Sequence, residues 1–507
     1  MCFTQNKKIN NKVFEPAKPN TTDWNSINWN KVNRHVTSLQ ERIYLASRKG
    51  DKKKVRDLQR QLIRSYYALI KAVKRVTQEN KGKYTPGIDG FKATTDKARG
   101  QLVDMLKEDN IKLHRPKPAL RKYIPKKNGK LRSLGIPTIK DRVYQEILRM
   151  ALEPEWEAKF EPTSNGFRPK RRQHDAIARN YYNIKSGKWC WIFEGDFKSC
   201  FDTLSHDFIL KQIKDFPLFN LVKRFLEAGY VDNNVFNTTE EGTPQGGLLS
   251  PLLANIALHG MEEALGISYK EQHTVVKGKP KIKYIPNGDY RVSRYADDFL
   301  IFAQSKEDID KVPELLQPYL KERGLILAED KTFITHLSKG FDFLGMNFKR
   351  DKDGVSRIRP SKDTIKKFKE KVDYICKSTY GDNVGTLIGR LNPLIRGNVN
   401  YWRYAVSNMD EMSKIDSYIW MKVFNFLKRL HNNKGVRWIK EKYFPLFYDG
   451  KHHRNWVLKD PISDNTLELM TFYKPKRYIM VKHDYSPYDK DKKEYFESRK
   501  TNFSLFF

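Results

Sequence analysis

The spacing of apolar residues near the N-terminus predicts a helix. From Lys53 to Val76 they recur every three or four positions, at Val55, Leu58, Leu62, Tyr66, Leu69, Val73 and Val76. Because one helical turn takes 3.6 residues, these side chains share one face. The other faces carry eight Lys and Arg residues, which suit either plain solvation or a polyanion. The helix should end before the turn signals Pro86-Gly87 and Asp89-Gly90.

The next segments predict a basic β-hairpin and a helix. Arg121–Pro125 and Leu134–Pro137 are short strand-like runs on either side of the turn Asn128-Gly129. A helix is expected around Asp141–Leu152, where the apolar spacing returns to three and four.

Three further apolar runs predict strands in the middle of the chain. Trp189–Phe193 is short and aromatic, which is typical of a buried strand, and Asp196 follows it closely. Val292–Tyr295 and Phe299–Ala303 are separated only by Ala296, Asp297 and Asp298. This arrangement predicts a hairpin with two acids at its tip.

Beyond Gly345 the pattern becomes helical again, with Pro360, Pro393 and Gly397 as breaks. After Pro445 the pattern is irregular. No repeat or low-complexity block interrupts the chain.

Composition adds a strong positive charge to this picture. The chain has 507 residues with 96 Lys and Arg against 60 Asp and Glu, a net charge of +36. Residues 1–90 carry +13 (20 − 7) and residues 345–507 carry +15 (34 − 19), so the middle carries only +8 (36 − 13 − 15). Two basic ends around a more acidic body favour a nucleic-acid partner, and an anionic membrane surface is the alternative.

The composition also excludes several classes. With 39% hydrophobic residues the chain can build cores, so disorder throughout is excluded. It has no apolar run of about 18 residues, and its N-terminus lacks the apolar core of a secretory signal. Its four cysteines include no CxxC pair, which excludes a disulfide framework and a cysteine-based zinc site. We therefore expect an intracellular protein without a membrane partner.

The acids between strands are the strongest candidates for chemistry. Asp297 and Asp298 repel each other, so a strong countercharge must justify their position. If the strands that precede Asp196 and Asp297 are neighbours in one sheet, all three carboxylates meet at one edge. Such oxygen clusters bind hard divalent cations, and two Mg²⁺ held there suit phosphoryl transfer. An isolated acid pair in a solvated loop is the alternative.

Several longer strings make the sequence resemble the reverse transcriptase–maturases encoded by group II introns. The strings are Tyr123–Pro137, Asn165–Arg168, Glu194–Asp202, Gly242–Gly247 with Ser250-Pro251, Arg294–Phe299 and Gly340–Gly345. The likeness runs from Trp24–Trp29 to Val436–Lys440. It implies an α+β right-hand polymerase, with fingers, a palm that holds an antiparallel sheet, a helical thumb and a basic helical N-terminal extension.

The resemblance also implies a domain division. Residues 1–90 would form the basic N-terminal extension and residues 91–345 the fingers and palm. Residues 346–444 would form the thumb or maturase domain. Residues 445–507 would be a basic, DNA-binding-like remnant without the HNH endonuclease module of longer family members, because the paired CxxC motifs of that module are absent.

Residue roles carry over by position from the resemblance. Asp196, Asp297 and Asp298 match the catalytic, metal-binding acids, and Phe197 is counted with them as a metal and nucleotide contact. Lys126 and Arg132 match the clamp on the incoming triphosphate, and Phe201 matches the residue that excludes a ribose 2′-OH by collision. Gln245 matches a contact to nucleotide and template. Lys331 matches a lysine near the leaving pyrophosphate.

A third set is expected to bind RNA or DNA. Its members are basic or aromatic residues of the N-terminal extension, of the segment Asn165–Arg168 and of the thumb: Arg56, Arg60, Arg64, Lys71, Lys74, Arg75, Arg168, Arg396, Tyr401, Trp402, Arg403, Lys428, Arg429, Arg437 and Trp438. A solvated face or a helical core is the alternative for each of them.

The resemblance thus implies an RNA-directed DNA polymerase that uses two Mg²⁺ ions, with dNTPs, an RNA template and a DNA primer as substrates. It also implies a maturase that binds its group II intron RNA for splicing and retrohoming at a DNA target. Bacterial cytoplasm and an organelle interior are both compatible locations. A catalytically silent maturase, and a reverse transcriptase recruited to phage defence or CRISPR adaptation, are the alternatives. A virus-type RNA polymerase is disfavoured by Tyr295-Ala296 and Phe201.

Overall fold

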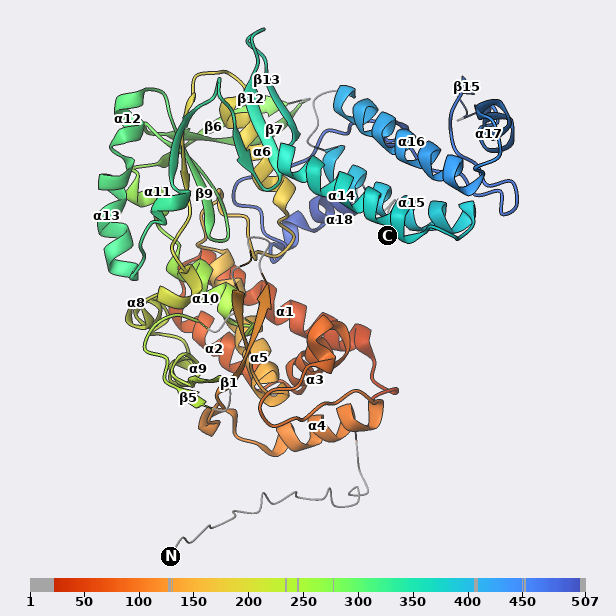
Figure 1. Cartoon of the computed structure of the whole chain (residues 1–507). Coiled ribbons are helices and arrows are strands. Elements are labelled where there is room, and N and C mark those ends of the chain that lie inside the picture. Colours follow the sequence, from red (N-terminus) through yellow and green to blue (C-terminus); the bar gives the residue numbers. More distant parts are fainter. Residues whose placement is uncertain are drawn as a thin grey trace, which may run out of the picture. The chain divides into compact units, whose positions relative to one another are not determined.

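The computed structural model describes residues 22–125, 129, 131–232, 235–243, 246–276, 278–404, 409–448, 450 and 453–501 (Figure 1). These residues form two compact units. Unit 1 takes in Met1–Phe160, Ser199–Leu258 and Ser486–Asp491, and unit 2 takes in Glu161–Lys198, His259–Tyr485 and Lys492–Phe507. The four-part domain division expected from the sequence stays a prediction.

Unit 1 is mainly helical. Its helices are α1 (Trp29–Arg48), α2 (Lys52–Ile63), α3 (Tyr66–Lys74), the π-helix η1 (Arg75–Glu79), η2 (Lys81–Tyr84), α4 (Asp96–Glu108), η3 (Ile111–Leu113), α5 (Ile139–Glu157), α7 (Cys200–Thr203), α8 (His206–Gln212), α9 (Phe219–Leu226) and α10 (Ser250–Ala257). The helix expected around Asp141–Leu152 is confirmed as the longer α5.

The single helix expected from Lys53 to Val76 is wrong. The segment breaks at Arg64 and Ser65 into α2 and α3. The Ser65 hydroxyl accepts the Ala68 N–H and caps the new helix, which offsets the hydrogen bonds lost at the break. The apolar spacing continues across the break, so periodicity alone could not reveal it.

The two strands of the expected basic hairpin are confirmed within a four-stranded sheet of unit 1, although the second begins three residues earlier than expected. Asn128 of the expected turn lies outside the described residues. The sheet order is β2 (Leu131–Ile136), β1 (Ala119–Pro125), β4 (Tyr230–Asp232) and β5 (Val235–Asn237). Strands β1 and β2 are antiparallel, with Ile124 opposite Arg132. Strand β4 lies parallel to β1. The Tyr123 hydroxyl donates to Asp232 and ties these two strands together.

Unit 2 carries the second large sheet, with the antiparallel order β10 (Phe333–His336), β3 (Trp191–Gly195), β9 (Asp298–Ala303) and β8 (Arg291–Tyr295). All three strands expected in the middle of the chain are present here. Strand β3 begins two residues later than the apolar run. The elements that precede and connect the strands of this sheet within unit 2 are α6 (Gln173–Ile184), α11 (Met261–Ala264), the hairpin β6 (Ser268–Val276) and β7 (Lys279–Asn287), α12 (Lys306–Asp310), α13 (Val312–Arg323) and η4 (Glu329–Lys331).

The expectation that the chain turns helical directly after Gly345 is wrong. A three-stranded sheet, β11 (Phe341–Phe343), β12 (Met346–Arg350) and β13 (Ser356–Pro360), comes first. Met346, Phe348 and Ile358 are buried and their neighbours are more exposed, which is the period of two of a half-buried strand. The strands are short, so the helical pattern that follows them dominates the sequence signal.

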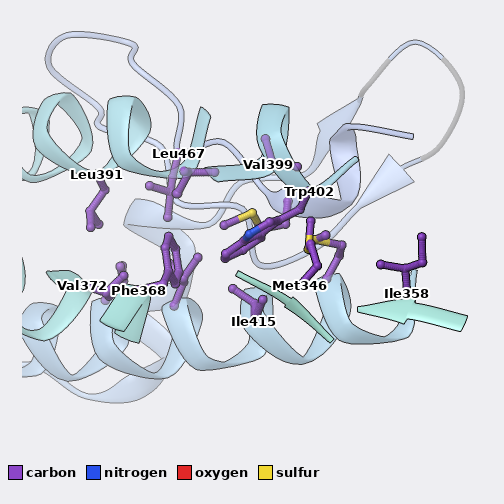
Figure 2. Close-up of a cluster of buried hydrophobic side chains, with 14 of the residues drawn as sticks. Met346, Ile358, Phe368, Val372, Leu391, Val399, Trp402, Ile415 and Leu467 are labelled. Atoms are coloured by element: carbon purple, nitrogen blue, oxygen red, sulfur yellow. The ribbon is translucent and has the colours of Figure 1, made fainter. Parts of the chain in front are cut away.

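The helices expected beyond this point pack around a shared core, but Pro393 and Gly397, expected as breaks, lie inside the single helix Val384–Trp402. The helices are α14 (Lys362–Ser378), α15 (Val384–Trp402), α16 (Asp410–Leu430) and α17 (Val436–Tyr443). Figure 2 shows the core, in which Trp402, Phe368, Ile415 and Leu467 come together from different elements. The Trp402 and Phe368 rings lie 5.6 Å apart, edge to face.

The segment after Pro445 has little regular structure, as expected. It contains β14 (Phe447–Tyr448), β15 (His453–Arg454), η5 (Met470–Phe472), η6 (Lys490–Lys492) and α18 (Lys493–Thr501). A fully buried acid of α6, Asp175, binds several groups of this segment. This carboxylate accepts the Tyr478 hydroxyl at 2.9 Å, the Val481 N–H at 2.6 Å and the Arg499 guanidinium at 3.0 Å. None of the helices within the described ranges is long and apolar enough to cross a membrane.

Candidate active site

Asp297 and Asp298 lie at the tight connection between β8 and β9. Tyr295 pairs with Asp298, so only Ala296 and Asp297 form the turn. Ala296 has φ of 59°, the left-handed conformation that such a turn requires. The fully buried Arg294 guanidinium donates to the Ala296 carbonyl at 3.1 Å and so stabilises the turn.

The segment Asn165–Arg168 supports the same turn. The Asn165 N–H donates to the Arg294 carbonyl at 2.9 Å. At Gly166 an added Cβ would lie only 2.2 Å from the Ala296 nitrogen, so no larger residue fits. Sequence reasoning treated this segment only as a family motif and Arg168 as a nucleic-acid contact. Gly166 and Arg294 are the positioning residues that it missed, and the glycine within the motif was the available signal.

Asp196 follows the strand next to β9. Gly195, the last residue of β3, pairs with Phe299 of β9. Asp196 and Asp298 are each one step further toward the same end of these antiparallel strands. Asp196 is about a hundred positions away from the adjacent Asp297 and Asp298 in the sequence, yet the three acids lie at one sheet edge, as the pattern predicted.

The carboxylates influence one another electrostatically. Desolvation, together with the negative charges of Asp297 and Asp196, raises the pKa of Asp298 to about 6. Lys331, at the end of η4, opposes this rise. Its ammonium lies 2.5 Å from Oδ2 of Asp196, and this hydrogen bond raises the pKa of Lys331. The edge thus holds excess negative charge beside one cation.

The backbone around Asp196 is held by the strand-like segment before η4. The Ala328 N–H donates to the Asp196 carbonyl at 2.9 Å and the Lys198 N–H to the Ile326 carbonyl at 2.8 Å. Phe197 lies between these two hydrogen bonds, opposite Leu327. The segment before η4 therefore does not bond the N–H or the carbonyl of Phe197. The Phe197 ring is 2% exposed and stacks 4.9 Å from Phe299.

The chemistry of this edge fits a divalent cation. Crowded carboxylates with a raised pKa are stabilised when a divalent cation neutralises them. Asp196, Asp297 and Asp298 would hold it. No group of three His, Cys, Asp or Glu side chains in the described part of the chain already stands in a coordinating arrangement. Here Asp196 is engaged by Lys331 instead.

The residues expected to bind the nucleotide are distributed between the units. Arg132 is exposed on β2 and Phe201 is 8% exposed on α7, both in unit 1, whereas Lys331 belongs to unit 2. Phe201 lines a cavity of about 510 Å³ whose wall also holds Arg121 and the acids Asp202, Glu240 and Glu241. That cavity by itself would not attract phosphates. Lys126 and Gln245 lie outside the described residues.

The expected nucleic-acid contacts fall into two groups. Three of them are buried and hold the chain together, which corrects the expectation. Trp402 is 1% exposed in the core, and the guanidinium groups of Arg168 and Arg403 are buried and donate to backbone carbonyls.

The other members of this set reach the surface at least in part. Exposed members are Arg60, Arg64, Arg75, Arg396, Lys428, Arg429 and Arg437, and half-buried ones are Arg56, Lys71, Lys74, Tyr401 and Trp438. Their role in binding stays a prediction.

Three family models of known proteins match successive parts of this chain. A family model of the reverse transcriptase (RNA-dependent DNA polymerase) matches residues 124–348. Models of the N-terminal domain of reverse transcriptase and of the group II intron maturase-specific domain match residues 24–106 and 365–444.

Individual proteins show the same likeness. Protein YkfC of Escherichia coli is 36% identical over 56% of this chain and 81% of that protein. The group II intron-encoded protein LtrA of Lactococcus lactis is 35% identical over 54% of each chain, so this chain matches about half of LtrA's length. The solved telomerase of Candida albicans shares 14% identity over 62% of this chain and 60% of that chain, with a TM-score of 0.36.

Reverse transcriptases as a family use divalent metal ions, which agrees with the acidic edge described above. The polymerase model spans both Asp196 and the turn at Asp297 and Asp298, and the maturase model spans α14 to α17. The chain therefore belongs to the family of group II intron-encoded reverse transcriptases with a maturase domain.

Proposed function

We propose that this protein extends a DNA primer on an RNA template with dNTPs, and that it binds a group II intron RNA as a maturase. One observation carries the polymerase part. Asp196, Asp297 and Asp298 lie at one sheet edge, where burial and the charges of Asp297 and Asp196 raise the pKa of Asp298, and a divalent cation there would offset the crowded negative charge. The maturase part is supported by the matched maturase-specific domain and by the +15 charge of residues 345–507.

We assign the metal as Mg²⁺, with two ions, because hard carboxylate oxygens suit it and phosphoryl transfer needs charge neutralised at both reacting oxygens. When bound, these ions would lower the charge barrier to attack on the nucleotide. Asp196, Asp297, Asp298 and the Phe197 carbonyl would hold them. In this proposal Lys331 leaves Asp196 for the phosphates of the nucleotide, and Lys126, Arg132 and Gln245 contact the same substrate.

Primer extension tests the proposal directly. The purified protein should lengthen a labelled DNA primer on an RNA template when dNTPs and Mg²⁺ are present. Removal of divalent cations with EDTA should stop extension, and added Mg²⁺ should restore it. Extension that survives chelation would contradict the metal assignment, and a protein that binds RNA without extending the primer would be a maturase alone.

The preference for dNTPs should depend on Phe201. In the Phe201→Ala variant we expect the ratio of dNTP to rNTP incorporation to fall by about tenfold or more, because a steric block is lost. Single-nucleotide extension with each substrate measures the ratio. Phe225→Ala is the matched control, since this buried ring lines the same cavity. An unchanged ratio in Phe201→Ala, or an equal fall in the control, would refute the assignment.

A further inference from the structure

Unit 2 contains a cavity that the proposed polymerase site does not use. It has a volume of about 430 Å³ and lies where the segment before α18 crosses α6 and β13. Figure 1 shows these elements in different colours, because they are far apart in the sequence. Ile177 and Ile358 form its apolar floor. Its size lies within the range of small-ligand sites.

Aromatic rings form much of its wall. Tyr181 and Tyr182 come from α6, and Tyr404 and Tyr478 come from the chain after α15 and from the C-terminal segment. Tyr182 is 45% exposed, and the other three rings are buried or half-buried. The Tyr404 and Tyr478 ring centroids lie 6.1 Å apart, edge to face, so these two rings pack against each other. Tyr182 is therefore the most exposed of the four rings that line the cavity.

The charges at its rim are all of one sign. Lys185, Lys476 and Arg477 line the cavity, and none of the described residues that line it is an acid. The Arg477 guanidinium donates to the Tyr182 hydroxyl at 3.1 Å, which places a cation beside the exposed ring. The Lys476 N–H donates to the Arg403 carbonyl at 2.8 Å and fixes this segment in place. The Tyr478 hydroxyl donates to the buried carboxylate of Asp175, which fixes this ring in place.

A reachable ring between cations is suited to a nucleotide. Bases stack on aromatic faces, and Arg and Lys neutralise the flanking phosphates. A base inside a duplex presents only its edges, so only an unpaired base can enter a recess of this kind. An acidic peptide would also satisfy the charges, but it would leave the ring face without a stacking partner.

We propose that this cavity receives an unpaired nucleotide of a bound nucleic-acid strand. The base stacks on Tyr182, and Lys185, Lys476 and Arg477 contact the phosphates. This inference rests on the proposed function, since it assigns a further contact to the same nucleic-acid partners. Binding can be measured without dNTPs or metal, so a failure to polymerise and a failure of the cavity to bind are distinguishable.

The test uses the full chain and short strands that carry the fluorescent base 2-aminopurine. One strand is unpaired RNA, one is the same sequence as DNA, and one is an RNA hairpin with the base inside the stem. Stacking on Tyr182 should quench the unpaired base in RNA, in DNA or in both, and the arm that responds identifies the strand. Tyr182→Leu should weaken binding of that strand by about tenfold and abolish the quenching. Tyr182→Phe, which keeps the ring, should retain the quenching.

The cations are tested by salt dependence. Lys185→Gln and Arg477→Gln should each reduce the slope of log Kd against log salt by about 0.7 for a single strand. The control is Lys321→Gln, an exposed lysine on α13 outside the cavity, which should leave the slope unchanged. The proposal is overturned if the hairpin base is quenched as strongly as the unpaired base, if Tyr182→Leu keeps the quenching, or if Tyr182→Phe loses it. Tight binding of an acidic peptide in place of either strand would also overturn it.

Discussion

Replacing Asp297 and Asp298 together with asparagine should reduce primer extension by at least about a thousandfold. Asparagine keeps the size of each side chain and removes the charge that would neutralise metal ions at the sheet edge. The turn itself is held by the Arg294 guanidinium on the Ala296 carbonyl and by the close packing of Gly166, neither of which needs the two carboxylates. The variant should therefore fold, and the measurement is the single-turnover rate of nucleotide addition.

Binding provides the internal control for this prediction. The double variant should hold template RNA as tightly as the parent, because the lost groups would hold metal and not phosphates. Asp310→Asn removes a surface carboxylate of α12 that pairs with Lys306, and it should extend primers at the normal rate. If the double variant kept its rate, or if Asp310→Asn slowed extension equally, the acidic edge would not be the catalytic centre.

Replacing Asp175 with alanine should cost about 3–5 kcal/mol of unfolding free energy, because Arg499 would be left buried without a countercharge. Asp175 is fully buried and Arg499 is only 5% exposed. The same change removes the acceptor of the Tyr478 hydroxyl and of the Val481 N–H. Urea unfolding measures the loss, and limited proteolysis should show faster cleavage in the C-terminal segment.

Two further variants make this result specific. Asp373→Ala removes a partly exposed acid that contacts Lys422 and Tyr418, and it should cost no more than about 1 kcal/mol. Adding Arg499→Met to Asp175→Ala should recover part of the loss, since the uncompensated charge is removed. Equal losses in Asp175→Ala and Asp373→Ala, or no recovery in the double variant, would show that the segment is not anchored through this pair.

The sequence pattern predicted many helices and strands correctly, because turn residues and apolar periodicity act over only a few neighbouring positions. The hairpin of β1 and β2, the helix α5 and the strands β3, β8 and β9 each carry their own turn or periodicity signal. The break at Ser65 and the strands β12 and β13 were missed for a related reason. A capping hydroxyl and a short alternation of buried residues are weak signals beside a long apolar repeat.

The residues of the candidate site also divide into those that the sequence pattern revealed and those that it missed. The acids could be found because carboxylates placed after apolar strands have a chemical use, and because the strings around them resemble those of a known polymerase family. Trp402, Arg168 and Arg403 were misjudged because an aromatic or basic residue looks the same in sequence whether it meets RNA or closes a core. Gly166 and Arg294 were missed because their role lies in a contact between distant segments.

The sequence by itself determined the charge of this protein, most of its strands and helices, and the three carboxylates on which its proposed chemistry depends. Each of these follows from composition or from neighbours within a few positions. Only the tertiary structure decided which cations face those carboxylates, which aromatic residues remain reachable, and how Asp175 anchors a segment more than 300 positions away. Burial and long-range pairing arise when distant segments pack together, and no local pattern encodes them.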